Sequence, residues 1–255
     1  MANEFYNPFL SRSYDKYIDF GRADEKNDFL FYFSQLPYSN ILDEAAWKRL
    51  SIYYASVVPL SGNVLDLHTF RNSSYSQDHL NSVHEGVLDV FGIGMVAEEL
   101  VMNPLLNFWP GRWKVLNVND QSLRDSDIFH RVKFDCVTCT CTVIYWNDAL
   151  STVRKATKKA GTIHLAVTDR YLETKVVNFW RRNIRSMENN LQLLGDYLST
   201  AGWADIEVVD CRVRTSDGKL FTDMNGRVRH PLPQLDGKRM DPLWIVRGTN
   251  PDFTC

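Results

Sequence analysis

The chain has 255 residues, a formal net charge of -2 and a hydrophobic content of 44%. This length and hydrophobic content predict one large domain with a full core. The near-neutral charge argues against a nucleic-acid binder that works through overall charge, and no apolar run approaches the roughly 18–20 residues of a membrane-spanning helix.

The amino-terminal residues match neither a secretory signal nor an organelle transit peptide, since they lack a charged-then-apolar order and contain Glu4, Asp15 and Asp19. The five cysteines are an odd number, and three of them crowd into residues 136–141, which does not resemble a disulfide framework. We therefore expect an intracellular, reducing compartment, with the cytoplasm favoured over an organelle.

Residues 1–40 are rich in Phe and Tyr, and we expect them to form a cap segment on a main domain of residues 41–255. The main domain opens with a helix that Asp43 caps, because Trp47, Leu50 and Tyr54 recur at helical spacing before Pro59. Strands and helices then alternate. The expected strands are 64–67, 86–93, 113–118, 134–142, 162–168, 206–214 and 243–248. The further expected helices are 97–102, one that Asn147 caps and Gly161 ends, 174–182, and 187–200, which Gly202 closes.

This alternation predicts an α/β fold with a doubly wound, seven-stranded, mostly parallel sheet. The last two strands have no helix between them, so they should form a carboxy-terminal antiparallel β-hairpin. The order of elements is that of a Rossmann-like fold.

The first strand, Val64-Leu65-Asp66-Leu67, is typical of a nucleotide-cofactor fold, in which a glycine-rich turn follows the strand. Here His68-Thr69-Phe70-Arg71 follows instead, and the next glycine is Gly86. A rival register would take 87–94, which ends in Gly-x-Gly, as the cofactor loop and would leave 64–67 without a place. Asp66 is expected either to contact a ligand or to orient the loop, and His68 is expected at the mouth of the sheet, with or without a chemical role.

Four segments carry a resemblance to a known family. They are FGIGMVAEELVMNP (91–104), FDCVTC (134–139), TDRYLETK (168–175) and DPLW (241–244). In this order they resemble class I S-adenosylmethionine-dependent methyltransferases, specifically a branch related to the type 11 group. The resemblance covers residues 31–248 and implies a methyltransferase fold with S-adenosylmethionine as its cofactor.

The resemblance also implies a set of site residues. Gly94 stands where the family has a carboxylate for the ribose hydroxyls, and Asn117 stands where an acidic residue often contacts the adenine. Restoring the carboxylate with Gly94→Asp is therefore expected to strengthen cofactor binding. The implied cofactor-binding residues are Asp66, Leu67, His68, Gly94, Met95, Asn117, Val118, Cys139 and Thr140. The substrate candidates are Tyr145, Trp146 and Asp169, with core packing as the alternative for the two aromatic residues.

Two basic clusters are either solvated helix faces or contacts for RNA or a protein. The first comprises Arg154, Lys155, Lys158 and Lys159, and the second comprises Arg181, Arg182 and Arg185. We expect no metal site, because a strand places Cys136 on the opposite face from Cys139 and Cys141 and no matching His or Cys cluster appears elsewhere.

Two functions remain open. The first is a methyltransferase that transfers a methyl group from S-adenosylmethionine to an unidentified substrate. The second is a catalytically degenerate methyltransferase fold that serves as a binding or assembly subunit of a larger complex, for instance a ribonucleoprotein. Because the glycine loop and the ribose carboxylate are missing, we expect weak or no cofactor binding in either case.

Overall fold

The computed structural model describes residues 5–6, 21–23, 28, 42–119, 126–146, 149–183, 187–212 and 241–251. Most of the expected cap segment, the expected helix cap Asn147 and the residues 213–240 therefore lie outside the described residues.

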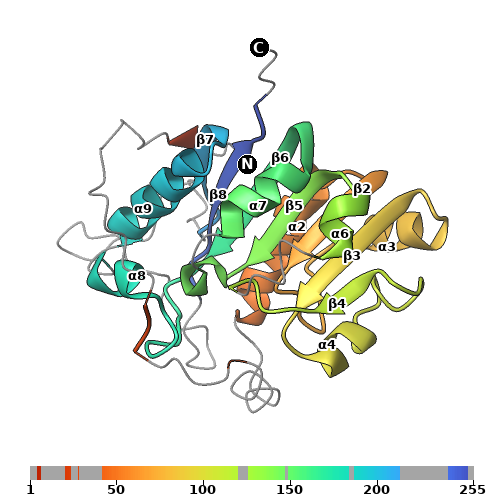
Figure 1. Ribbon diagram of the computed structural model, residues 1–255, viewed down its shortest axis with the longest axis horizontal. Helices are drawn as coiled ribbons and strands as arrows, with labels where there is room; N and C mark the ends of the chain where they lie inside the picture. The colour runs from red at the N-terminus through yellow and green to blue at the C-terminus, as the bar shows by residue number, and fades with distance from the viewer. Residues whose placement is uncertain are drawn as a thin grey trace.

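One twisted sheet runs through the described part of the chain, with the strand order β1-β7-β8-β6-β5-β2-β3-β4 (Figure 1). Its strands are β1 (Phe5–Tyr6), β2 (Gly62–Leu67), β3 (Leu88–Gly94), β4 (Trp113–Val115), β5 (Phe134–Thr140), β6 (Thr157–Val167), β7 (Ala204–Asp210) and β8 (Trp244–Thr249). The strands β2 to β6 pair in parallel, and β8 lies antiparallel between β6 and β7. The expected parallel sheet with a carboxy-terminal antiparallel hairpin is confirmed.

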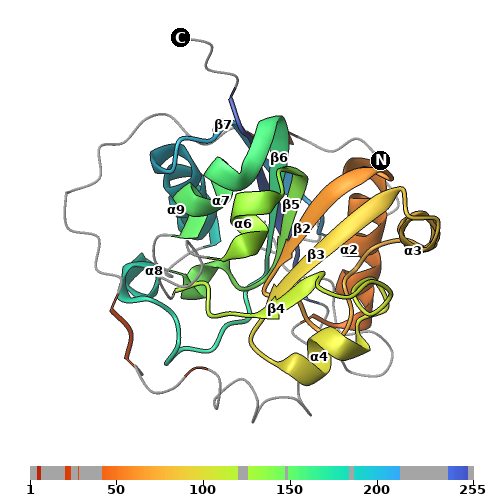
Figure 2. The same ribbon diagram turned by 45° about the vertical axis from the view of Figure 1, so that its right-hand side comes forward.

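Helices cover both faces of this sheet (Figure 2). One face carries α2 (Glu44–Val57), α3 (Gln77–His84) and α4 (Ala97–Met102), and the other carries α6 (Asp127–Arg131), α7 (Ala149–Ala156), α8 (Asn178–Asn183) and α9 (Met187–Thr200). A short 3-10 turn, η2 (Val143–Tyr145), follows β5. Each face of the sheet packs against its own hydrophobic core. Neighbouring strand residues point to opposite sides, so Val64 lies in one core and Leu65 in the other.

Three expectations about the elements need correction. The sheet has an eighth strand in its described part, because Phe5–Tyr6 pairs antiparallel with β7 beyond the expected edge. Gly161 does not end a helix: α7 stops at Ala156, and Gly161 lies inside β6 where an added Cβ would be 3.0 Å from the carbonyl oxygen of Asp135 on β5. The helix expected over 174–182 begins only at Asn178.

The central position of β2, hydrogen-bonded to both β3 and β5, excludes the rival register. Residues 88–94 form the neighbouring strand β3, so they are not the loop that follows the first strand of the parallel sheet. No helix in the described ranges combines the length and the apolar character that crossing a membrane requires.

A reciprocal contact joins the start of α2 to the start of β8. The Asp43 side chain caps α2 by accepting from the backbone nitrogen of Ala46 at 2.7 Å, and its second oxygen accepts from the backbone nitrogen of Asp241. The Asp241 carboxylate in turn accepts from the backbone nitrogen of Asp43 at 2.7 Å and pairs with Arg170 at 2.7 Å. This clasp fixes the segment that follows β6, which carries part of the candidate site.

We predict that Asp241→Ala lowers the free energy of unfolding by about 1–3 kcal/mol, because the part-buried backbone donor of Asp43 loses its acceptor. Asp241→Asn is the matched control, since its amide oxygen can still accept that hydrogen bond. Chemical denaturation of both variants checks the prediction, and equal losses would show that the acceptor contributes nothing.

Candidate functional site

The candidate site lies where the parallel strands β2 to β6 reach their carboxyl ends. Open α/β sheets bind ligands at this edge, just beyond the strand ends. The chain segments that follow β2, β4, β5 and β6 meet here, so the site is built from what each of them contributes.

Asp66, on β2, serves the loop that follows its strand. It is 5% exposed, and its carboxylate accepts hydrogen bonds from Ser73 Oγ at 2.7 Å and Thr138 Oγ1 at 3.0 Å. Its backbone oxygen accepts from Thr69 Oγ1 at 2.6 Å. Burial raises the pKa of the carboxyl group to about 6, against the lowering effect of these hydroxyl donors. Of the two expected roles, the contacts favour orientation of the loop, through hydroxyl groups.

His68 begins the loop after β2, where the sequence resemblance implies glycine. Its φ is +57°, in the left-handed region that glycine adopts readily and that, among other residues, Asn, Asp and His adopt more often than most. The ring is buried beside Phe70, with 5.4 Å between the ring centres. Burial lowers the pKa of His68 to about 4, although the Asp28 carboxylate works in the opposite direction. The imidazole is therefore neutral and fills space that a glycine would leave open.

Gly94 lies beneath the chain that follows β2. The backbone nitrogen of Thr69 donates to the carbonyl oxygen of Ile93 at 2.7 Å, which holds this loop against the end of β3. A Cβ added to Gly94 would be 2.6 Å from the backbone oxygen of Thr69 and 3.0 Å from Leu100 Cδ2. The glycine is thus required by close packing, and the expectation that Gly94→Asp would strengthen cofactor binding loses its basis because no space exists for the carboxylate.

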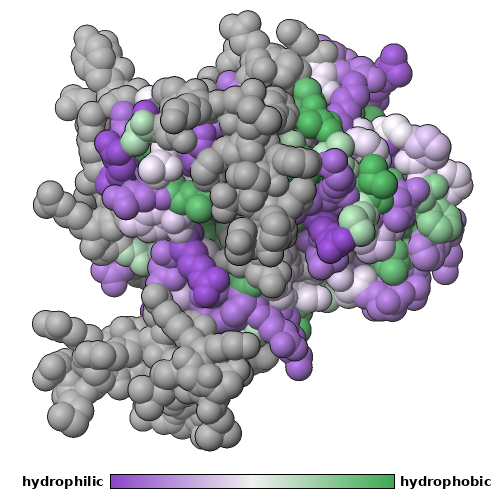
Figure 3. Space-filling model, turned by 90° about the horizontal axis from the view of Figure 1, so that it is seen from below, coloured by the Kyte–Doolittle hydropathy of each residue, from purple (hydrophilic) through white to green (hydrophobic). Residues whose placement is uncertain are grey.

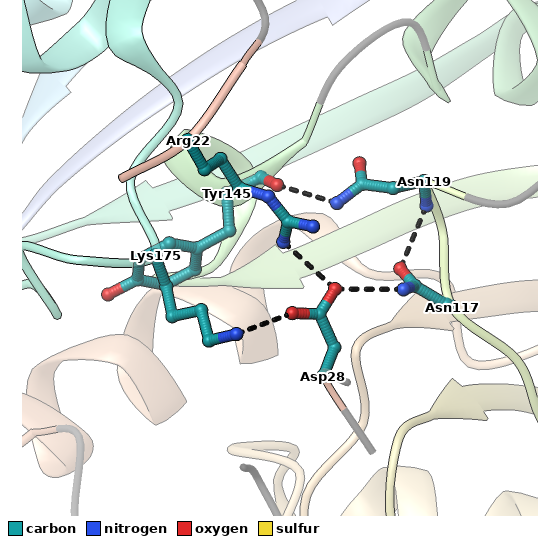
Figure 4. Close-up of polar contacts among 6 residues, drawn as sticks. All are labelled: Arg22, Asp28, Asn117, Asn119, Tyr145 and Lys175. Carbon is teal, nitrogen blue, oxygen red and sulfur yellow. Dashed lines mark hydrogen bonds and ion pairs between the residues drawn. The ribbon is translucent and has the colours of Figure 1, made fainter. Parts of the chain in front are cut away.

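A charged cluster that the sequence did not indicate lies at the same edge (Figure 4). Asp28 Oδ2 accepts from Arg22 at 2.8 Å and from Asn117 Nδ2 at 2.9 Å, and Asp28 Oδ1 accepts from Lys175 Nζ at 2.9 Å. Burial alone would raise the pKa of Asp28, but the hydrogen bonds from Arg22 and Lys175 outweigh it and hold the pKa below its usual value. Asp28 is therefore ionised and neutralises cations inside the protein.

This carboxylate spans the candidate site. Asn117 follows β4 and Lys175 follows β6, and in the sheet order β5, β2 and β3 lie between these two strands. One side chain from the amino-terminal segment thus joins the far sides of the edge at which the cofactor of a methyltransferase would be expected.

Tyr145 and Trp146 belong to the core, in agreement with the alternative that the sequence left open. The Tyr145 hydroxyl accepts a hydrogen bond from the backbone nitrogen of Leu172 at 2.7 Å. The backbone oxygen of Tyr145 accepts one from Asn119 Nδ2 at 2.8 Å. Trp146 is fully buried. Tyr145 therefore ties together the segments that follow β4, β5 and β6.

The other expected site residues lie at the same edge but are buried or committed to internal contacts. Cys139 Sγ lies 3.1 Å from Thr142 Oγ1, and burial raises the pKa of this thiol to about 12. Thr140 Oγ1 lies 3.4 Å from the Tyr54 hydroxyl, whereas Asp169 is half-buried on the segment after β6. The buried members are Leu67, Met95, Val118, Cys139 and Thr140. Within the described residues, no group of three or more His, Cys, Asp or Glu could hold a metal ion.

The first basic cluster is not one helix face, because Arg154 and Lys155 lie on α7 whereas Lys158 and Lys159 lie on β6. Arg154 donates to the carbonyl oxygen of Ala201 at 2.8 Å, after the end of α9, and Lys158 pairs with Asp135 at 2.8 Å. Lys155 and Lys159 are exposed. In the second cluster Arg181 is exposed, while the side chain of Arg182 and the whole of Arg185 lie outside the described residues.

Several solved structures are similar to this architecture. The 1,6-didemethyltoxoflavin-N1-methyltransferase of Burkholderia thailandensis, solved with S-adenosylhomocysteine, has a TM-score of 0.52 and 14% identity over 88% of this chain and 87% of that one. Phosphoethanolamine N-methyltransferase 2 of Haemonchus contortus, also solved with S-adenosylhomocysteine, has a TM-score of 0.50 and 14% identity over 88% and 60%. A methyltransferase in complex with the Haloferax volcanii Trm112 methyltransferase activator has a TM-score of 0.49 and 14% identity over 89% and 100%.

The chain has the class I methyltransferase fold. No family model matches its sequence, and no curated protein matches it.

The residues that the sequence resemblance assigns to S-adenosylmethionine make contacts inside this protein. Gly94, which the resemblance places at the ribose carboxylate, is covered by the Thr69 backbone, and the ring of His68, in the loop after β2, is buried. The amide of Asn117 is used twice, since its oxygen accepts from the backbone nitrogen of Asn119 at 3.0 Å and its nitrogen donates to Asp28. A cofactor would have to displace all three sets of contacts.

Sequence reasoning missed Arg22, Asp28 and Lys175. The first two lie in a segment whose only signal was its aromatic content, and Lys175 was read as part of the TDRYLETK segment of the family resemblance. An ion pair between residues that are 147 positions apart leaves no periodic pattern in a sequence.

We predict that Gly94→Ala lowers the free energy of unfolding by about 1–3 kcal/mol, because overpacking against the Thr69 backbone forces the loop to move. Gly248→Ala is the control, since its added Cβ would be 3.3 Å from the nearest atom and should cost less. Chemical denaturation of the two variants makes the comparison. A fully tolerated Gly94→Ala would show that the loop does not rest on β3.

We also predict an acid-dependent loss of stability from His68. A folded-state pKa of about 4, below the unfolded value of 6.5, means that the unfolded chain binds the extra proton between these pH values, so stability falls as the pH falls through this window. His68→Asn tolerates the same backbone conformation, and it should remove about 3 kcal/mol of the fall between pH 6.5 and 4. Denaturation at several pH values measures the difference between the two proteins, with His130→Gln as an exposed control. Parallel pH profiles for wild type and His68→Asn would contradict the burial of a neutral ring.

Proposed function

We propose that this protein is a catalytically degenerate methyltransferase fold that acts as a binding or assembly subunit. The single observation that carries the proposal is the Asp28 carboxylate, which bridges Asn117 and Lys175 across the edge that a methyltransferase keeps for its cofactor. Two further features support the proposal: the Thr69 backbone covers Gly94, and the ring of His68 is buried. They involve β3 and the loop after β2, whereas Asp28 contacts the segments after β4 and β6.

Each of these features replaces a contact to the cofactor with a contact inside the protein. The fold stays intact, since the two cores on either side of the sheet are continuous and the parallel strands keep their register. A closed edge on an intact fold is the arrangement expected of a scaffold that has kept its stability and lost its reaction.

A binding role also needs a surface, and large apolar side chains are exposed on α4 and on the segment that joins it to β4. Val101, Met102, Phe108 and Trp109 are 43–52% exposed, and Phe108 stacks on His84 with 4.3 Å between the ring centres. On the face of the molecule seen from below, hydrophobic residues are interspersed with hydrophilic ones (Figure 3). Exposed aromatic and apolar groups of this kind suit contact with another macromolecule. Lys155, Lys159 and Arg181 remain candidates for a contact with RNA or a protein.

The second candidate is a working S-adenosylmethionine-dependent methyltransferase. One observation favours it: the Asp28 bridge consists of one side chain from a separate segment, and Asn117 keeps an amide at the end of β4 where it could face an adenine. In that case removal of the Asp28 carboxylate alone should open the edge to the cofactor.

The test is the thermal unfolding midpoint with and without S-adenosylmethionine or S-adenosylhomocysteine. A ligand present at a hundred times its dissociation constant raises stability by about 2.7 kcal/mol, which is a rise of roughly 5–10 °C for a domain of this size. We predict a rise of less than about 1 °C at about 100 μM of either ligand, because the contacts that would hold them are used internally.

The same measurement on Asp28→Ala separates the two candidates. A degenerate fold stays unresponsive, because Gly94 and His68 remain covered. A rise of several degrees in the wild type, or in Asp28→Ala alone, would overturn the proposal in favour of the methyltransferase.

A further inference from the structure

A strip of basic residues runs along the face of the sheet that carries α6 and α7. These two helices lie next to each other (Figures 1 and 2). The strip starts on β4, follows α6 to its end, and finishes where the chain leaves α7 and enters β6. We call this strip the cationic rim, and its members are Lys114, Arg131, Lys133, Lys155 and Lys158.

Contacts between its members make the cationic rim continuous. Lys114 and Arg131 both pair with the Asp127 carboxylate, which lies on the first turn of α6. Two residues after Arg131, Lys133 Nζ donates to the backbone oxygen of Lys155 at 2.6 Å. The basic cluster that the sequence indicated on residues 154–159 is therefore extended in space by residues from β4, α6 and the segment before β5.

The cationic rim holds more cations than anions. One of its two carboxylates, Asp127, is shared by two members, and the other, Asp135, pairs with Lys158 at 2.8 Å. Lys133 and Lys155 are exposed, and neither pairs with a carboxylate in the described part of the chain. Five cations thus face two carboxylates, although the whole chain has a formal net charge of -2. The positive charge is concentrated here, so this surface attracts an anionic partner.

The composition of the cationic rim shows which anionic partner fits. In the described ranges the large exposed apolar side chains lie elsewhere, and none of those described within 126–135 or 153–162 belongs to them. Protein interfaces are enriched in apolar and aromatic groups and depleted in Lys, and single-stranded nucleic acids need aromatic side chains for base stacking. Exposed Lys and Arg without such groups suit the phosphates of a nucleic-acid duplex, which basic side chains contact without reading the sequence.

The cationic rim is well separated from the candidate site. Lys133 directly precedes β5, and Lys155 comes two residues before β6, so both lie at the amino ends of parallel strands. The candidate site lies at the carboxyl ends. The seven residues of β5 place about 20 Å between the two. A partner on the rim therefore leaves the contacts of Asp28 untouched.

We propose that the cationic rim binds the phosphate backbone of a double-stranded nucleic acid. This inference rests on the proposed function, because it names the partner of a binding or assembly subunit. RNA and DNA duplexes share this phosphate chemistry, and the experiment compares them.

The experiment is a fluorescence anisotropy titration of labelled 20-base-pair RNA and DNA duplexes with the full-length protein, without cofactor. We expect a dissociation constant of about 1–100 μM near physiological salt, the range of sequence-independent binding. Because the contacts are to phosphates, affinity should fall roughly a hundredfold between 50 and 200 mM sodium chloride. Polyglutamate and vesicles of 30% phosphatidylserine in phosphatidylcholine offer the same charge on a protein-like and a lipid partner, and both should bind more weakly.

Two pairs of substitutions make the result specific. Lys133→Gln combined with Lys155→Gln should weaken duplex binding at 50 mM salt by about tenfold and reduce the salt slope by about 2, since two phosphate contacts are lost. The matched control, Lys48→Gln combined with Arg71→Gln, removes the same charge from exposed positions outside the rim and should change neither value appreciably. Lys133→Arg combined with Lys155→Arg keeps the charge and should bind as the wild type does.

Asp127→Asn gives a test that loss of folding cannot imitate. It removes the carboxylate that Lys114 and Arg131 share, so duplex binding should become several-fold tighter. The unfolding midpoint of every variant shows whether the fold is kept.

Four results would overturn the proposal. These are no binding of either duplex at 50 mM salt up to about 100 μM protein, equal weakening in the rim and control variants, tighter binding of polyglutamate, and tighter binding of the vesicles. The cofactor titration reports separately on the proposed function. A thermal shift with S-adenosylmethionine would overturn that function and leave duplex binding as measured, whereas failed duplex binding would leave the degenerate fold with a different partner.

Discussion

The burial of the Lys175 ammonium group is the constraint on which the candidate site depends. A charge that is fully removed from water must have an anion beside it, and Asp28 from the amino-terminal segment supplies an anion to Lys175. Once Asp28 lies there, Arg22 and Asn117 complete its coordination, and the loops after β4 and β6 are joined across the sheet. The closure of the edge follows from this one electrostatic requirement.

The loop after β2 illustrates a second constraint, which acts through shape. His68 retains the left-handed backbone of a glycine turn, so the path of the chain is that of a cofactor loop. The imidazole is then forced into the space that the turn encloses, and Thr69 is brought over Gly94. The path of this loop therefore explains Gly94: the Thr69 backbone lies where a side chain at this position would be.

The fold was predictable because it depends on local patterns. The apolar runs at 64–67 and 134–140 and the helical spacing of Leu50 and Tyr54 depend only on near neighbours in the sequence, and the alternation of strands and helices predicts parallel pairing. For the candidate site, the sequence predicted only its location, at the carboxyl ends of the parallel strands. The role of Gly161 was misjudged, because a glycine that ends a helix and a glycine that lets two strands approach look alike in sequence. Asp28 was missed because two of its three partners, Asn117 and Lys175, are far away in the chain and the segment around it carries no periodicity.

The amino-terminal segment makes most of its described contacts with distant parts of the chain, and this has a consequence for the order of folding. Phe5 pairs with Val209, Arg22 with Val177, and Asp28 with Lys175, which lies 147 residues later. During synthesis, these residues cannot make their distant contacts until the later segments have emerged from the ribosome. Contacts of such long sequence separation form late and slowly. The core of parallel strands can therefore assemble before its edge is closed, and the contacts of Asp28 with Asn117 and Lys175 form last.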